Sequence, residues 1–188
     1  MLKEEVEKAL KVLKSGGIIL YPTDTIWGIG CDACNPEAVE NIFKLKGRDE
    51  AKSMIILLDT ESKIPSYVRE VPDIAYDLIE YAENPLTIVF SGAKNLAPNA
   101  IAKDGSIGIR ITRDDFSKHL IQRFKKPIIS TSANISNQPS PTNFHEINDE
   151  IIHGVDLVVD WKQADMTPKK PSTIMKLEPD GRFVFLRR

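Results

Sequence analysis

The chain has 188 residues, of which 41% are apolar and 28% are charged, and its formal net charge is −2. This balance is typical of one globular domain, excludes a disordered chain, and argues against binding of nucleic acid through bulk charge. Because the apolar runs are too short to cross a bilayer and the charged N-terminus, MLKEEVEKAL, is unlike a signal peptide, we expect a single domain over residues 1–188, in the cytoplasm and without a membrane partner.

Apolar spacing and turn signals predict helices and strands that alternate along the chain. In chain order, the predicted elements are a helix through Val6 and Leu13, a strand over 17–21, a helix from Pro36, a strand over 54–58, a helix over 72–82, strands over 86–90 and 107–111, a helix through Phe116 and Phe124, a strand at 127–129, and strands over 155–159, 172–177 and 182–186. Gly16-Gly17 ends the first helix, and Pro22 ends the first strand. Compact apolar strands intermixed with helices predict an α/β domain with a mixed sheet covered by helices.

Polar side chains follow or interrupt the predicted strands in four stretches, at the places where α/β proteins usually bind ligands. The first, YPTDTIWGIG (21–30), offers the hydroxyls of Thr23 and Thr25 and the carboxylate of Asp24, although a capped turn explains it equally well. Its continuation, GIGCDA, fits the dinucleotide fingerprint G-x-G-x-x-A. That fingerprint needs its glycines directly between a strand and a helix, and residues 22–27 intervene, so we set a Rossmann site aside.

The second stretch, KLKGRDEAKS (44–53), carries four cations at the end of a predicted helix. They are Lys44, Lys46, Arg48 and Lys52. One or two cations at a helix C-terminus are explained by the helix dipole, but four indicate a polyanionic ligand. No Walker A sequence occurs, so a phosphate site here would be built from side chains rather than from a P-loop.

The third stretch, SIGIR (106–110), reads as a strand with one apolar face. Its alternation places Gly108 and Arg110 opposite the isoleucines. If that second face meets water, the arginine is simply solvated. If the face is covered, an acid or a ligand anion must meet the charge.

The fourth stretch, STSANIS (130–136), ends an apolar strand in small hydroxyl and amide side chains. A polar turn whose side chains bind their own backbone explains it in part. Taken together, the four stretches supply cations, hydroxyls and amides but few bases. Phosphoryl or nucleotidyl transfer is the reaction class that depends mainly on such positioning and charge stabilisation.

Other common sites have little support. Cys31 and Cys34 form a lone C-x-x-C, whereas a structural zinc site usually needs two more ligands, so we interpret the pair as a coincidence. The three histidines lie outside the polar stretches, and no Ser-His-acid grouping is suggested.

Six segments together resemble the YrdC/TsaC family of L-threonylcarbamoyladenylate synthases: GGIILYPTDTIWGIGCDA, KLKGR, SIGIRIT, STSANIS, PSTIMKL and FLRR. The resemblance implies a single YrdC-like domain over 1–188, with an open, twisted mixed α/β sheet and flanking helices around a deep, positively charged cavity. It also implies that L-threonine, bicarbonate and ATP, with Mg²⁺ on the triphosphate, give threonylcarbamoyl-AMP and pyrophosphate. A threonylcarbamoyl-transfer complex would then modify tRNA.

The resemblance implies roles for individual residues. Those of the family's polar tetrad are Lys46, Arg48, Ser132 and Asn134. Its two cations would bind the phosphates and bicarbonate, with Lys44 as a further candidate for that role. Thr23 or Thr25 would bind the threonine hydroxyl, and Arg110 its carboxylate. Ser130, Ser132 and Asn134 would orient the carbamate and phosphate oxygens. The weaker substrate-binding candidates are Ser53, Ser106, Ser140 and Arg187.

Some positions depart from the family pattern. Asp49 stands where proline usually follows K-x-R, and Asn137 stands where glycine is usual. Two alternative functions stay open. One is a double-stranded RNA or tRNA-binding module without catalysis, whose affinity would fall steeply with salt. The other is a carbamoyl-handling domain like that of the hydrogenase maturation proteins, although those chains are much longer.

Overall fold

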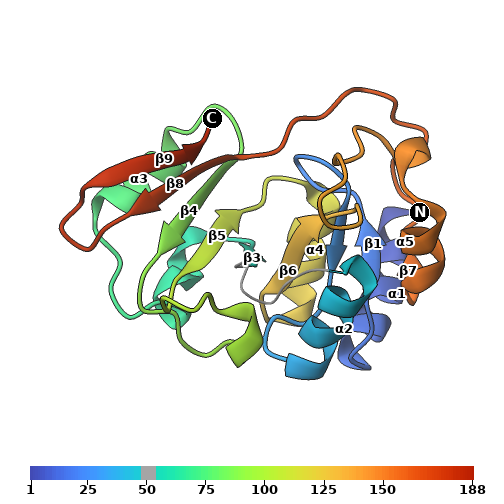
Figure 1. Ribbon diagram of the computed structural model, residues 1–188, viewed down its shortest axis with the longest axis horizontal. Coiled ribbons are helices and arrows are strands. Elements are labelled where there is room, and N and C mark those ends of the chain that lie inside the picture. The colour runs from blue at the N-terminus through green and yellow to red at the C-terminus, as the bar shows by residue number, and fades with distance from the viewer. Residues whose placement is uncertain (48–53) are drawn as a thin grey trace.

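A mixed nine-stranded sheet organises the computed structural model, whose described residues are 1–47 and 54–188 (Figure 1). The strands are β1 (Ile19–Tyr21), β2 (Gly28–Gly30), β3 (Ile55–Leu58), β4 (Leu86–Phe90), β5 (Ile107–Ile111), β6 (Ile128–Ser132), β7 (Leu157–Val158), β8 (Thr173–Leu177) and β9 (Phe183–Arg187). The α-helices are α1 (Leu2–Lys14), α2 (Pro36–Lys46), α3 (Ile74–Glu80), α4 (Asp115–Phe124) and α5 (Asp149–Gly154). Short 3-10 helices cover Glu61–Ser66, Pro98–Ala100 and Phe144–Glu146.

The strands lie in the order β7-β1-β2-β6-β3-β5-β4-β8-β9, with β7 and β9 at opposite edges (Figure 1). The pairs β1–β7, β3–β5 and β4–β8 are parallel, and the others are antiparallel. The predicted mixed sheet with covering helices is therefore confirmed, as is every predicted helix and strand. Among the described residues, no helix is long and apolar enough to span a bilayer.

Local signals explain where the elements start and stop. The Asn35 side chain accepts hydrogen bonds from the backbone N–H groups of Glu37 and Ala38, which caps α2. Gly47 ends the same helix in the left-handed conformation, with φ at 55°. These contacts are local, which is why the sequence could predict them.

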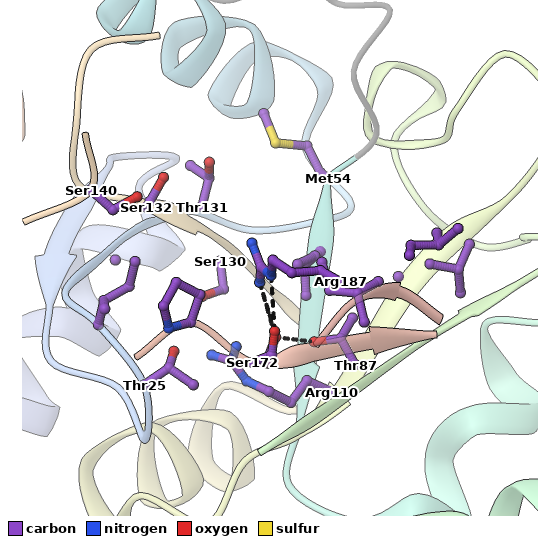
Figure 2. A pocket seen from close by; sticks show the side chains of 18 of the residues that line it. Thr25, Met54, Thr87, Arg110, Ser130, Thr131, Ser132, Ser140, Ser172 and Arg187 are labelled. Carbon is purple, nitrogen blue, oxygen red and sulfur yellow. Dashed lines mark hydrogen bonds between the residues drawn. The ribbon is translucent and has the colours of Figure 1, made fainter. Parts of the chain in front are cut away.

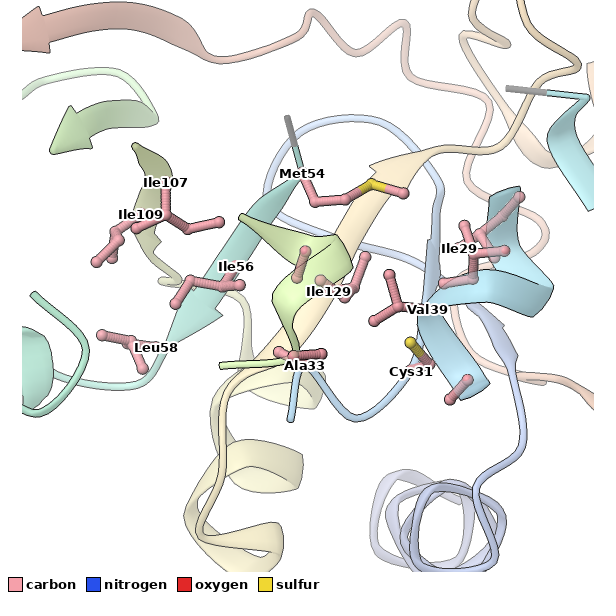
Figure 3. Close-up of a cluster of buried hydrophobic side chains, with 14 of the residues drawn as sticks. Ile29, Cys31, Ala33, Val39, Met54, Ile56, Leu58, Ile107, Ile109 and Ile129 are labelled. Atoms are coloured by element: carbon pink, nitrogen blue, oxygen red, sulfur yellow. The ribbon is translucent and has the colours of Figure 1, made fainter. Parts of the chain in front are cut away.

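Two hydrophobic clusters form the core. One lies where α1 and α4 pack together and includes Tyr21, Leu57 and Ile128 from the strands. The other includes Val39 of α2 and residues of strands β1 to β6 and β8, among them Ile107 and Ile109 (Figure 3). Ile107 and Ile109 of β5 are therefore buried in the core and Ile111 packs against it partly buried, on the face that the alternation predicted.

β2 and α5 were not predicted. β2 pairs with β1 on one side and with β6 on the other, so the glycines of GIGCDA lie in a strand and not in a strand-to-helix turn. A Cβ atom on Gly30 would lie 2.6 Å from the Ile129 carbonyl oxygen and 2.7 Å from the Tyr21 ring. Close packing inside the sheet, and not a dinucleotide, explains this glycine.

Candidate functional site

A cavity of about 530 Å³ opens on the sheet (Figure 2). Its lining residues are Thr25, Ile26, Trp27, Gly28, Met54, Ile55, Thr87, Val89, Gly108, Arg110, Ser130, Thr131, Ser132, Ser140, Pro171, Ser172, Ile174, Leu186 and Arg187. This described lining holds two arginines and several hydroxyls, and it includes no carboxylate. Anions are the ligands that such a lining favours.

Strand register explains how distant segments form the floor of the cavity. Directly paired residues point to the same face of a sheet, and residues two apart on one strand do the same. The paired lining residues are Gly28–Ser132, Ser130–Ile55, Ile55–Gly108 and Arg110–Thr87. Farther along the same strands and face, Leu57 and Ile128 belong to the cluster under α1 and α4. The cavity is thus the part of this sheet face that the two helices leave uncovered.

Arg110 lies at the cavity wall with only 4% of its surface exposed. Its Nη2 lies 3.2 Å from Oδ1 of Asp24, and both side chains are more than nine-tenths buried. The open question of the third stretch is answered by this ion pair, which supplies the acid that a covered arginine requires. Within the described structure, Nε and Nη2 of Arg110 are buried and donate no hydrogen bond, so the ion pair leaves part of the donor capacity of this guanidinium unused. Asp24 also borders a second cavity, of about 490 Å³.

A second arginine, Arg187 of β9, is anchored beside the first. Its Nε and Nη2 donate to the Ser172 carbonyl at 3.0 and 2.9 Å (Figure 2). The hydroxyls of Ser172 and Thr87 lie 2.8 Å apart. Burial lowers the pKa of Arg187, and the nearby positive charge of Arg110 lowers it further. Two guanidinium groups that repel each other across a cavity favour an anion between or beside them.

The two threonines of YPTDT take different positions. Thr25 lines the cavity, whereas Thr23 is not part of its described lining. The Thr23 hydroxyl donates to the Ile26 carbonyl at 2.8 Å and accepts from the Thr25 backbone N–H at 3.0 Å. Thr23 therefore shapes the turn, and Thr25 is the threonine that can meet a ligand.

The STSANIS stretch divides in the same way. Ser130, Thr131 and Ser132 end β6 and line the cavity. Asn134 lies beyond the strand, and its amide Nδ2 donates to the carbonyls of Ile135 and Gln138 at 2.9 and 2.8 Å. The short hydroxyls therefore face the cavity because they continue a strand, and the amide binds the turn that follows.

Lys46 lies beside Ser132 at the end of β6, although it is not part of the described cavity lining. The Lys46 side chain is buried, with 1% of the residue exposed, and its ammonium donates to the main-chain carbonyls of Ser132 and Asn134. Lys44, in contrast, is 69% exposed and lies 3.6 Å from Glu40 on the surface of α2. Its predicted place at the phosphates is therefore not supported, because the two lysines project from different sides of the helix.

The remaining candidates are scattered. Ser140 lines the cavity, whereas the Ser106 hydroxyl donates to Asp104 at 2.6 Å and is not part of the described lining. Arg48 and Ser53 lie outside the described residues. Sequence reasoning missed Thr87 and Ser172 as site residues. Thr87 pairs directly with Arg110 across β4 and β5, which places it at the site. The sequence does not reveal this pairing, because strand register is set by the folded sheet.

Comparison with known proteins identifies the family. Residues 11–188 match the Sua5/YciO/YrdC family, whose description reads "telomere recombination". The chain belongs to the Sua5/YciO/YrdC family. A Methanocaldococcus jannaschii protein is 36% identical over 183 residues, which are 95% of this chain and 84% of that protein. The threonylcarbamoyl-AMP synthase of Pseudoalteromonas translucida is 33% identical, over 90% of this chain and 91% of that enzyme.

Solved structures of the family share the fold. P. abyssi Sua5 complexed with L-threonine superimposes with a TM-score of 0.83 at 25% identity, covering 97% of this chain and 53% of that one. The chain therefore spans about half the length of that Sua5 protein. E. coli YciO superimposes with a TM-score of 0.85 at 22% identity, covering 100% of this chain and 90% of that one. That level of identity supports the fold alone.

Proposed function

We propose that this chain is a threonylcarbamoyl-AMP synthase, which makes threonylcarbamoyl-AMP and pyrophosphate from L-threonine, bicarbonate and ATP. The observation that carries the proposal is the cavity, whose lining holds several hydroxyls and two arginines. Relatives that match most of this chain carry that activity in their names. L-Threonine is also the ligand in one structure of P. abyssi Sua5.

In this proposal Arg110 and Thr25 hold the amino acid. Arg110 binds the threonine carboxylate, and Thr25 binds the threonine hydroxyl. Ser130 and Ser132 orient the carbamate and phosphate oxygens, and Arg187 meets the nucleotide. The family resemblance also assigns Arg48 to the phosphates, and that assignment stays a prediction from the sequence.

The reaction needs little proton transfer by the protein. The threonine amine forms a bond to the carbon of bicarbonate, and the amine proton leaves with a hydroxyl as water. A carbamate oxygen then attacks the α-phosphorus of ATP. The bond between the α-phosphorus and the oxygen that bridges it to the β-phosphate breaks, and that oxygen leaves with pyrophosphate. A cavity lined by guanidinium and hydroxyl groups aligns these anions and offsets their repulsion, which is the main catalytic requirement of such a transfer.

Mg²⁺ would enter with ATP. Among the described residues, no cluster of three or more His, Cys, Asp or Glu side chains could hold a metal ion, and the described lining has no carboxylate. Such a site suits a magnesium ion that is held by phosphate oxygens and water, as Mg²⁺ commonly is.

Pyrophosphate release tests the proposal. The protein is assayed with MgATP and bicarbonate, and each amino acid is added separately. We expect release that requires both L-threonine and bicarbonate. Release that ignores threonine, or that responds equally to serine and alanine, would contradict the proposal. We further propose that the product passes, in the cytoplasm, to a complex that modifies tRNA.

A further inference from the structure

We propose that Lys46 is a positioning residue, which shapes the turn after β6 and does not itself contact the phosphates. Residues 132–138 are called the β6 turn below. The proposal rests on the proposed function for its effect on catalysis, but its structural part concerns the ligand-free protein.

Three hydrogen bonds join Lys46 to the β6 turn. Its ammonium donates to the carbonyls of Ser132 and Asn134, and its own carbonyl accepts from the Ser136 backbone N–H at 2.8 Å. Ser132 and Asn134 follow Lys46 by 86 and 88 residues in the sequence. The last residue of α2 therefore ties that helix to the turn from both its main chain and its side chain.

Burial makes this arrangement hard to exchange for a phosphate contact. Only 1% of Lys46 is exposed, and the residue is not part of the described cavity lining. If the ammonium moved to a phosphate, the carbonyls of Ser132 and Asn134 would lose a charged donor. Both hydrogen bonds are part-buried, and leaving a fully buried acceptor unpaired costs about 1–3 kcal/mol, so each lost bond here would cost up to about that amount.

Asn134 completes the same arrangement. Its Nδ2 donates to the carbonyls of Ile135 and Gln138. Lys46 and Asn134 together thus engage four carbonyl oxygens of one turn. Carbonyl oxygens repel phosphate oxygens, so fixing them on internal donors keeps negative partial charge away from the anion site beside Ser132.

Hydrogen exchange of the ligand-free protein tests the structural part. Lys46→Met removes the donor, whereas Lys44→Met removes an exposed charge from the last turn of the same helix and serves as the control. We expect exchange across the β6 turn to become at least about tenfold faster in Lys46→Met and to stay unchanged in Lys44→Met. Unchanged exchange in both variants would overturn the proposal.

Binding of a ligand series tests the mode of action. If Lys46 acts through the β6 turn, Lys46→Met should lower the affinities for adenosine, AMP and ATP by the same factor in calorimetric titrations. A loss that grows with each added phosphate would instead identify a direct phosphate contact. Neither readout depends on threonine, so failure of pyrophosphate release would contradict the proposed function and leave this inference standing.

A measurement on the unmodified protein covers the case in which Lys46→Met does not fold. An ammonium buried in hydrogen bonds gives a slowly exchanging ¹⁵Nζ signal, which Lys46→Arg would identify by its loss. We expect this signal in the ligand-free protein, with a chemical shift that MgATP leaves unchanged. A shift on MgATP binding, or no protected ammonium, would overturn the proposal.

Discussion

The buried ion pair between Arg110 and Asp24 connects the stability of the fold to the proposed site. Their side chains are 5% and 9% exposed, and Nη2 lies 3.2 Å from Oδ1. Asp24→Asn leaves a buried cation without its acid, and Arg110→Met leaves a buried carboxylate without its cation. Each single change should lower the free energy of unfolding by about 3–5 kcal/mol. For a chain of this length, Tm should fall by about 6–20 °C.

The double variant Asp24→Asn/Arg110→Met removes both charges at once. Its loss of stability in urea unfolding should be smaller than the sum of the single losses by at least about 2 kcal/mol. Losses that add to within about 0.5 kcal/mol would show that the two side chains are not coupled and would refute this reasoning.

A ligand extends the test to the proposed role of Arg110. Without Asp24, the threonine carboxylate becomes the nearest acid for the buried arginine. L-Threonine should therefore raise the Tm of Asp24→Asn by more than it raises that of the unmodified protein. L-Threoninol, which has no carboxylate, is the matched control and should give no such difference.

Two further predictions concern packing and thiol chemistry. Gly30→Ala places a Cβ atom 2.6 Å from a backbone oxygen, so it should lower the free energy of unfolding in urea by about 1–3 kcal/mol. Gly28→Ala is the control, because its nearest contacts are 3.3–3.4 Å away, and it should lower this free energy by less. Equal losses of free energy in the two variants would contradict the packing explanation. Burial raises the pKa of both the Cys31 and Cys34 thiols, so iodoacetamide at pH 7.5 should modify Cys34 slowly and Cys31 only after unfolding. Rapid labelling of Cys31 in the folded protein would contradict the burial of its thiol. Because the folded protein holds the two thiol protons more tightly than the unfolded chain, the thiols stabilise the fold below their ordinary pKa of 9.0, and this stabilisation is lost as the pH rises above that value towards the raised pKa values of the folded protein.

Much of the candidate site could be predicted because its side chains follow strand ends. Alternation along β5 indicated that Arg110 leaves the core face, and the small polar residues of β6 marked a strand end that lines the cavity. The cation cluster at the end of α2 was harder to interpret. Lys44 and Lys46 look alike in sequence, yet one is at the surface and the other is buried, because their side chains leave the helix in different directions.

By itself, the sequence determined the type and order of nearly all elements, since helical spacing, caps and strand alternation depend on neighbouring residues. Only the tertiary structure decided which polar groups meet. It made GIG a strand, paired Arg110 with Asp24, and placed the Lys46 ammonium on carbonyls 86 and 88 residues away. Such partners are set by sheet order and register, which are properties of the whole packed chain and are not encoded in any short stretch of it.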